Sequence, residues 1–411
     1  MSAKKPILRI WSNRQYTTMV SGGVPSYITS WMQRVGIGWL AWEMTHSALW
    51  LGIVAAADLA PMIFMGAFAG AITDRNNPLK QMRLSQSLLF LQAVALSVLQ
   101  FLGIMSIEVL VGLALFAGLV YPFHQAARHS VLVGVVERED FAPAIGADSA
   151  LFHASRFVGP ALAGLVIPAV GVQGTFFAHV LGSFAFVTAL HMIKLLRRVD
   201  RKGHRGTLMQ DITDGFSYVR AHRGIFPLFI LLTFACIFLR PLQDMYPAFA
   251  GRVYGSDAVG LSWLNSATGV GALISAAWIA TRGRLQGLTT FAYGGMFLFS
   301  VSTLVFVSSD QLWIGVIAAG FCGFFLNNLT TSVQTLAQSS VSDAMRGRVM
   351  GLYALIWRGI PAVGALAGGL AADLIGIRAT FAVAALVCIA AVILAIPFLR
   401  RIIDAMEHPN D

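Results

Sequence analysis

Two charged side chains lie inside the first long apolar part of the sequence. Arg34 stands thirteen residues before Ser47, which belongs to a short polar turn, and Asp58 stands eleven residues after it. If the flanking runs form a helical hairpin across a bilayer, a rise of about 1.5 Å per residue puts both charges roughly 17–20 Å from one membrane face. A charge at that depth costs several kcal/mol unless it is paired or faces water. The spacing therefore predicts a fixed structural pair, a working pair in which Asp58 takes up a proton and releases Arg34, or a site for an anionic substrate.

The composition of the chain predicts a membrane protein. Of its 411 residues, 57% are hydrophobic and 12% are charged, and the mean hydropathy is +0.72. A soluble domain carries about twice this charged fraction, and apolar runs of about 20 residues are long enough to cross a bilayer as helices. The three cysteines lie in apolar runs without disulfide or metal spacing. The basic and then polar N-terminal segment has no pattern of a cleavable signal peptide.

The apolar runs predict an all-α membrane protein with twelve transmembrane helices in two pseudo-symmetric six-helix bundles. The expected spans are 17–43, 48–72, 84–105, 107–130, 143–169, 172–194, 224–248, 257–281, 287–308, 311–334, 347–372 and 377–399. A polar linker at 195–223 separates an N-terminal bundle at 1–194 from a C-terminal bundle at 224–411. Apolar residues of its TLMQDITDGFSYVRAH stretch recur near helical spacing, which predicts an amphipathic helix on the cytoplasmic surface.

Positive charge gathers at one end of the predicted spans. Most of the 29 Lys and Arg residues lie near the two termini, in the central linker or in loops after even-numbered spans. The loop after the second span is assigned Arg75, Lys80 and Arg83, and the loop after the fourth is assigned Arg128 and Arg138. Because cytoplasmic loops carry an excess of Lys and Arg, we expect both termini in the cytoplasm. The net charge of +10 then reports topology, and nucleic-acid binding is not expected.

The two halves of the sequence resemble each other. The segment RFVGPALAGLV at 156–166 is echoed by RGIPAVGALAGGL at 358–370, which puts Arg156 and Arg358 at related places. Internal duplication is typical of transporters that bind substrate near the membrane midplane, between two repeats. Arg156 and Arg358 are therefore interpreted either as cavity-lining residues or as cytoplasmic gates.

The organisation and several motifs resemble the major facilitator superfamily. Gly70, Asp74, Arg75 and Lys80 form a partial version of that superfamily's signature in the loop after the second span. The runs at 30–52, 155–164 and 346–353 resemble the branch of bacterial exporters for siderophores and drugs, with enterobactin exporters among them. The resemblance implies that Gly70, Asp74 and Arg75 form a cytoplasmic gate. The alternative is an ordinary positively charged loop.

The fifth span is similar to the antiporter signature of the superfamily's exporters. Its residues are Gly146, Ser155 in place of the usual glycine, Gly159, Pro160 and Gly164. Small residues allow a neighbouring helix to approach closely, and the proline removes a hydrogen bond and favours a bend. The alternative is that Gly and Ala here are only those of any membrane helix.

Further polar residues lie in predicted spans. Arg240 and Asp244 are spaced i, i+4 and are expected to pair on one helix face, either as a local salt bridge or in substrate contact or outer gating. Tyr121, Asn327 and Asn328 are candidates for lining a cavity or for hydrogen bonds between helices.

No pattern indicates catalysis, because the chain lacks GxxxxGK[ST], HExxH and a nucleophile elbow. We therefore expect a secondary active transporter of the inner membrane that exports a small molecule by alternating access. The resemblance implies the proton gradient as energy source, no cofactor and no metal. The expected partners are the substrate, protons and the lipid bilayer, with a monomer as the functional form. Alternatives are an importer on the same fold, a lipid or lysolipid flippase, and a membrane enzyme or sensor.

Overall fold

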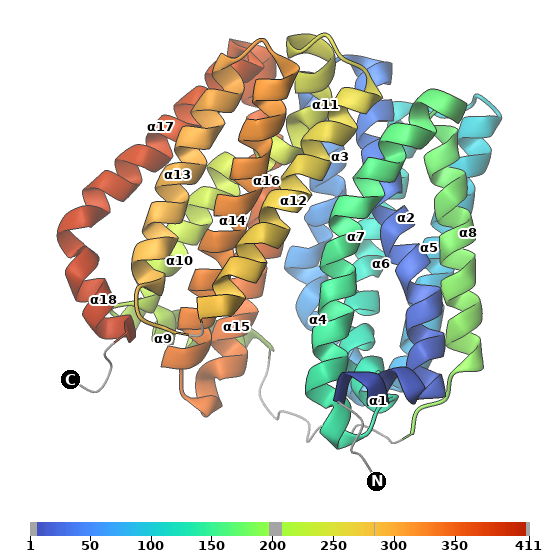
Figure 1. Ribbon diagram of the computed structural model, residues 1–411, viewed down its shortest axis with the longest axis horizontal. Helices are drawn as coiled ribbons and strands as arrows, with labels where there is room; N and C mark the ends of the chain where they lie inside the picture. Colours follow the sequence, from blue (N-terminus) through green and yellow to red (C-terminus); the bar gives the residue numbers. More distant parts are fainter. Residues whose placement is uncertain (1–5, 197–207, 283, 408–411) are drawn as a thin grey trace. The chain divides into compact units, whose positions relative to one another are not determined.

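The chain folds almost entirely into helices (Figure 1). This computed structural model describes residues 6–196, 208–282 and 284–407. The first helices are α1 (Pro6–Ser12), α2 (Arg14–Thr45), α3 (Ala48–Leu59), α4 (Pro61–Arg75), α5 (Pro78–Phe101), α6 (Ile107–Gly134), α7 (Phe141–Val170) and α8 (Gln173–Met192). The later helices are α9 (Leu208–Ala221), α10 (Ile225–Phe234), α11 (Tyr246–Ala248), α12 (Ala258–Arg282), α13 (Leu288–Ser308), α14 (Leu312–Ser340), α15 (Asp343–Arg358), α16 (Ile360–Ile375), α17 (Ile377–Ala395) and α18 (Leu399–Glu407). No strand occurs in these residues, which confirms the all-α class.

Eleven helical segments of the described chain are long and apolar enough to cross a membrane. They correspond to eleven of the twelve predicted spans. The remaining predicted span, 17–43, lies within the 32 residues of α2, which is not among the eleven. The polar linker contains α9, as predicted, while its residues 197–207 lie outside the described part.

Proline positions explain where two long helical segments break. α3 ends at Leu59 and α4 begins at Pro61, whereas α15 ends at Arg358 and α16 has Pro361 in its first turn. A proline has no N–H to donate, and its ring crowds the residue before it, so a helix ends just before a proline or bends there. Each pair of helices therefore makes one interrupted span.

The segment Ile225–Val253 has the most irregular helical backbone in the described chain. After α10 it forms a π-helical turn at Ala235–Leu239, a 3₁₀ turn at Arg240–Met245, α11, and a second π-helical turn at Phe249–Val253. Prolines 241 and 247 each remove one backbone donor, which forces such changes in hydrogen-bond register.

The start of α5 corrects the predicted loop after the second span. Asn77 caps the helix by accepting hydrogen bonds from two backbone N–H groups, and Pro78 occupies its first turn. Lys80 and Arg83 therefore lie inside α5. The Arg83 Nε donates to the carbonyl of Leu190 at 2.8 Å, at the end of α8. The assignment of Lys80 and Arg83 to a loop was wrong, because Asn is a favoured N-cap residue and Pro is favoured in the first turn of a helix.

The contacts between residues divide the chain into two compact units. Unit 1 comprises Met1–Met44 and Phe64–His204, and unit 2 comprises Thr45–Ile63 and Arg205–Asp411. Within unit 1, Figure 1 shows α1 lying across the ends of the long helices. Asn13 makes the corner, because its side-chain oxygen accepts from the backbone N–H groups of Gln15 and Tyr16 at the start of α2.

Glycines allow close helix packing in unit 2. A Cβ at Gly271 of α12 would clash with the carbonyl of Gly320 on α14, and a Cβ at Gly369 of α16 would lie 2.6 Å from the carbonyl of Ala48 on α3. Membrane helices associate through such backbone contacts, because burial from lipid supplies no hydrophobic driving force.

A carboxylate fixes the start of α3 to α16. Asp373 accepts hydrogen bonds from Ser47 Oγ at 2.6 Å, from the Ala48 N–H at 3.0 Å and from the Leu49 N–H at 3.2 Å. The first N–H groups of a helix have no partner inside it, and its N-terminus favours negative charge. Asp373 therefore caps α3 from a neighbouring helix.

Replacing Asp373 by alanine is expected to lower the free energy of unfolding by about 1–2 kcal/mol, because the amides at the start of α3 lose their acceptor. Asp373→Asn should lose less, since its amide oxygen still accepts. The midpoint of thermal unfolding of the detergent-purified protein measures both. Asp404→Ala, at an exposed position of α18, is the matched control. Equal midpoints for Asp373→Ala and Asp404→Ala would contradict the cap.

Candidate functional site

One face of α2 meets one face of α7 in unit 1. Tyr27, Trp31 and Arg34 follow each other at helical spacing on α2, and Asp148, Phe152 and Arg156 do so on α7. Together with Arg128 of α6 we call these seven residues the arginine–aromatic ladder. The contacts among these residues involve aromatic rings, guanidinium groups and one carboxylate.

Gly159 brings the two helices together at the ladder. A Cβ at Gly159 would lie 2.5 Å from the Ile28 carbonyl oxygen and 2.5 Å from the Cβ of Trp31. A side chain there would push α7 away from α2, because real Cβ atoms essentially never make such contacts. The glycine of the antiporter-like motif therefore sets the distance between the helices that carry Trp31 and Arg156.

A buried ion pair forms one end of the ladder. Arg128 Nη2 lies 2.6 Å from Asp148 Oδ2, and the two side chains are only 4% and 6% exposed. The Arg128 Cζ also lies 4.5 Å from the ring centroid of Tyr27 and 4.8 Å from that of Phe152. The guanidinium is thus held by one carboxylate and two aromatic rings, which is a favourable way to keep a charge inside a membrane segment.

The position of Arg128 corrects the sequence-based topology. It was assigned to the loop after the fourth span, but α6 continues to Gly134 and buries Arg128 inside unit 1. The topology prediction used only the positions of basic residues in the sequence, so it placed an arginine near a span end at the membrane surface. The sequence positions alone do not show that a carboxylate on another helix pairs with this arginine. Asp148 was not singled out at all, although an acidic residue inside the apolar run 143–169 is the signal that would have found it.

Several polar atoms around this ion pair have no hydrogen-bond partner among the described residues. They are Nδ1 of His124, Nε of Arg128 and Oη of Tyr16, all buried. The His124 ring packs edge-on against Phe186 at 6.1 Å between centroids. Buried polar atoms in native proteins nearly always have partners. The surroundings of Arg128 and Asp148 therefore contain polar atoms whose hydrogen-bonding capacity the described protein groups do not use.

Two arginines stack on one indole ring at the other end of the ladder. Arg34 Cζ lies 5.7 Å from the Trp31 ring centroid, and Arg156 Cζ lies 5.3 Å from it. All three side chains are partly exposed. Both contacts are within the range of cation–π attraction. Arg34 and Arg156 therefore share one aromatic partner, Trp31.

The predicted pair of Arg240 and Asp244 is present in unit 2. Arg240 Nη1 lies 3.0 Å from Asp244 Oδ2, and the side chains are 12% and 10% exposed. The pair sits on the 3₁₀ turn of the irregular segment after α10. Its geometry is that of a local salt bridge on one face of the helix.

The remaining candidates are distributed over separate helices. Tyr121 on α6 lies beside His124, with 6.3 Å between ring centroids. On α14, Asn327 Nδ2 and Asn328 Oδ1 are buried and have no hydrogen-bond partner in the part of the chain that the structure describes. Asp58 on α3 and Arg358 at the end of α15 are partly buried.

The residues of the predicted gate and of the antiporter-like motif differ in packing. A Cβ at Gly70 or Gly146 would meet no atom within 4 Å, in contrast to Gly159. Gly164 is partly exposed on α7, next to the buried Ala163, and Pro160 is buried. Arg75 is exposed at the end of α4, and the Asp74 side chain lies outside the described part of the structure.

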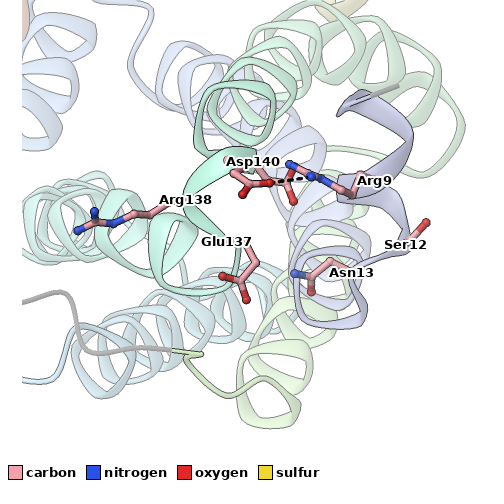
Figure 2. A pocket seen from close by; sticks show the side chains of 7 residues that line it. Arg9, Ser12, Asn13, Glu137, Arg138 and Asp140 are labelled. Atoms are coloured by element: carbon pink, nitrogen blue, oxygen red, sulfur yellow. Dashed lines mark hydrogen bonds and ion pairs between the residues drawn. The ribbon is translucent and has the colours of Figure 1, made fainter. Parts of the chain in front are cut away.

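A surface pocket of about 620 Å³ lies between α1 and the connection from α6 to α7 (Figure 2). Arg9 Nε donates to Asp140 at 2.7 Å, and Arg9 Nη1 donates to Glu139 at 2.9 Å. These hydrogen bonds to carboxylates raise the pKa of Arg9. The Glu139 side chain is 78% exposed, whereas that of Asp140 is only 7% exposed. The bond from Arg9 to Asp140 therefore ties α1 to the connection from α6 to α7.

Comparisons with known proteins bear on the whole chain. Residues 11–410 match the family described as transmembrane secretion effectors. The staphyloferrin A transporter of Staphylococcus aureus is 25% identical over 361 residues, covering 87% of this chain and 89% of that protein. Macrolide efflux protein A of Streptococcus pyogenes is 21% identical over 397 residues, covering 95% and 98%. The structure of the nucleoside transporter NupG is similar with a TM-score of 0.72 at 12% identity, over 94% and 99% of the two chains; this last likeness shows the fold alone.

Asp148→Asn is expected to destabilise the protein by about 3–5 kcal/mol, because it leaves Arg128 buried without its counter-charge. The double variant Arg128→Met with Asp148→Leu should recover most of this loss, since no charge then remains buried. Thermal unfolding of the purified variants measures the coupling between the two positions. A single variant as stable as the unmodified protein would contradict the tight pair. Transport by the stable double variant then tells whether the pair is needed for function.

Proposed function

The chain belongs to the transmembrane secretion effector family of the major facilitator superfamily, and we propose that it exports a small molecule across the inner membrane in exchange for protons. The match over residues 11–410 carries this proposal. The names of two relatives add to it, because one transports staphyloferrin A and the other effluxes macrolides.

Asp58 is the proton carrier in this proposal. It lies ten residues after the first residue of α3, so roughly 15 Å along the helix from its start. An aspartate at such depth gains stability by taking up a proton whenever its partner moves away. Arg34, eleven residues before the end of α2, is the partner favoured by the sequence pattern.

The gate of this proposal uses residues away from the proton carrier. Asp74 and Arg75 end α4, where a carboxylate can pair with a basic residue or with the N-terminus of a neighbouring helix. Arg358 lies beside the break between α15 and α16, a place where a span can bend. No cofactor takes part, and the working unit is a monomer with both termini in the cytoplasm.

Asp58→Asn is expected to abolish proton-coupled transport while the protein still folds and inserts, because the amide cannot take up a proton. The measurement is proton release from inverted membrane vesicles, followed with a pH-sensitive dye. The panel of compounds contains cationic drugs, catecholate siderophores and organic anions. A compound that collapses the imposed gradient with the unmodified protein, but not with Asp58→Asn, establishes exchange against protons.

The matched control for this experiment is Asp404→Asn, which removes an exposed carboxylate of α18. It should transport as the unmodified protein does. Unchanged coupling in Asp58→Asn would remove Asp58 from the role of carrier. Silence across the whole panel, with the protein confirmed in the membrane, would favour uniport, lipid flipping or a narrow substrate outside the panel.

Asp74→Asn is expected to slow turnover more than it weakens substrate binding, since a gate residue acts on the exchange between conformations and not on the ligand. Initial transport rates at saturating substrate and equilibrium binding to the purified variant separate the two effects. An equal loss in both measurements would contradict the gate.

A further inference from the structure

We propose that Arg400 and Arg401, at the start of α18, bind the phosphate group of an anionic phospholipid, and that the apolar elbow before them contacts the acyl chains of the same lipid. The elbow comprises residues 393–398, where α17 ends and α18 begins. This lipid site on unit 2 goes beyond the proposed function, because it is independent of the compound that the protein carries.

The length of α17 places the two arginines at the edge of the membrane. Arg378, near the start of α17, is paired with Asp310, and residues 379–399 carry no charged side chain. From Arg378 to Arg400 the rise along the helical chain adds up to about 33 Å, slightly more than the roughly 30 Å of the hydrocarbon core. Arg400 and Arg401 therefore reach the level of the phosphate groups on the membrane side opposite to Arg378.

A proline makes the elbow between the two helices. Pro397 lies in the 3₁₀ turn Ile396–Phe398, and Figure 1 shows that α18 there leaves the direction of α17. Four large apolar side chains of the elbow are more than half exposed: Ile393, Leu394, Ile396 and Phe398. An exposed apolar surface that borders basic side chains is suited to the boundary between acyl chains and headgroups.

The two arginines lie on the face of α18 that points away from unit 2. Ile402 and Met406, one helical turn apart, are only 3% and 1% exposed and pack on the unit. Arg400 and Arg401 are exposed, and neither forms a hydrogen bond or an ion pair within the described residues. Asp404 shares their face, so the arginines exceed it by one positive charge.

The other end of α18 is anchored, which holds the arginines in place. Glu407 accepts hydrogen bonds from the backbone N–H groups of Gly287 at 2.5 Å and of Thr289 at 2.8 Å, at the start of α13. A Cβ at Gly224 would clash with the Met406 side chain, so α18 also packs tightly at the start of α10. The helix is therefore fixed before a lipid binds, which lowers the entropy cost of binding.

The charge of this surface matches an anionic headgroup. A guanidinium binds phosphate through two parallel N–H groups, and each basic residue near anionic lipid strengthens the attraction. Arg284 is also exposed, three residues before Gly287 in the connection that Glu407 binds. Phosphatidylcholine carries a cation that arginines repel, whereas phosphatidylglycerol carries only the charge of its phosphate. The surface therefore favours phosphatidylglycerol.

Native mass spectrometry of the detergent-purified protein tests this preference. The probes are phosphatidylglycerol and phosphatidylcholine with identical oleoyl chains, so that only the headgroup differs. We expect the first phosphatidylglycerol to bind about tenfold more tightly than the first phosphatidylcholine. Inorganic phosphate at constant ionic strength should leave this affinity unchanged, because it lacks the acyl chains that the elbow contacts.

Variants assign the preference to the two arginines. Arg400→Gln with Arg401→Gln should reduce binding of phosphatidylglycerol to the level of phosphatidylcholine. Arg400→Lys with Arg401→Lys should fall between, because it keeps both charges but loses the planar forks. Arg220→Gln with Arg223→Gln removes two exposed charges from α9 and the connection after it. This charge-matched control should keep the preference.

A photoreactive phosphatidylglycerol locates the bound lipid. It carries a diazirine in one acyl chain, and peptide mass spectrometry identifies the residues to which it cross-links. The cross-links should concentrate on residues 393–399 and should decrease there in the double glutamine variant. The same lipid with a choline headgroup should give no such concentration.

Four results would overturn the proposal. They are equal binding of the two lipids by the unmodified protein, an equal loss in the charge-matched control, competition by inorganic phosphate, and cross-links at 393–399 that do not depend on the arginines. Size-exclusion profiles and thermal midpoints identify a variant that fails to fold. If the glutamine pair does so, the lysine pair carries the test, and an unchanged preference in it contradicts the proposal.

Discussion

The cost of placing a charge in a medium of low dielectric governs the polar architecture of this protein. An unpaired charge at membrane depth costs several kcal/mol, so the described ion pairs inside spans are short and enclosed. Arg128 meets Asp148 and two aromatic rings, whereas Arg240 meets Asp244 one helical turn away. In each of these pairs the opposite charges lie within hydrogen-bond distance, so neither charge is left buried without its counter-charge.

The positions of the polar side chains also depend on close contact between helices, which single glycines allow. Gly159 lets α7 touch the backbone of α2 at Trp31, and Gly369 lets α16 touch α3 near the residues that Asp373 caps. In lipid, such contacts replace the hydrophobic effect as the force that holds helices together. A polar group can therefore be positioned accurately where a glycine lies one turn away, as Arg156 is beside Gly159.

The sequence was sufficient for features set by length or by local spacing. Apolar runs of the right length predicted the helices, and the i, i+4 spacing predicted the pair of Arg240 and Asp244. Arg128 and Asp148 are 20 residues apart on different helices, so their pairing depends on how α6 packs against α7. The stacking of Arg156 on Trp31 likewise depends on the register between α2 and α7, which only the glycine contact fixes and no local pattern reveals.

The arginine–aromatic ladder and the proposed proton carrier belong to different compact units of the chain. Every member of the arginine–aromatic ladder lies on α2, α6 or α7, within unit 1. Asp58 lies in the segment Thr45–Ile63, which the contacts assign to unit 2. A change in the ladder therefore alters the packing and charge of unit 1 around Trp31, whereas a change at Asp58 removes from unit 2 a group that can take up a proton.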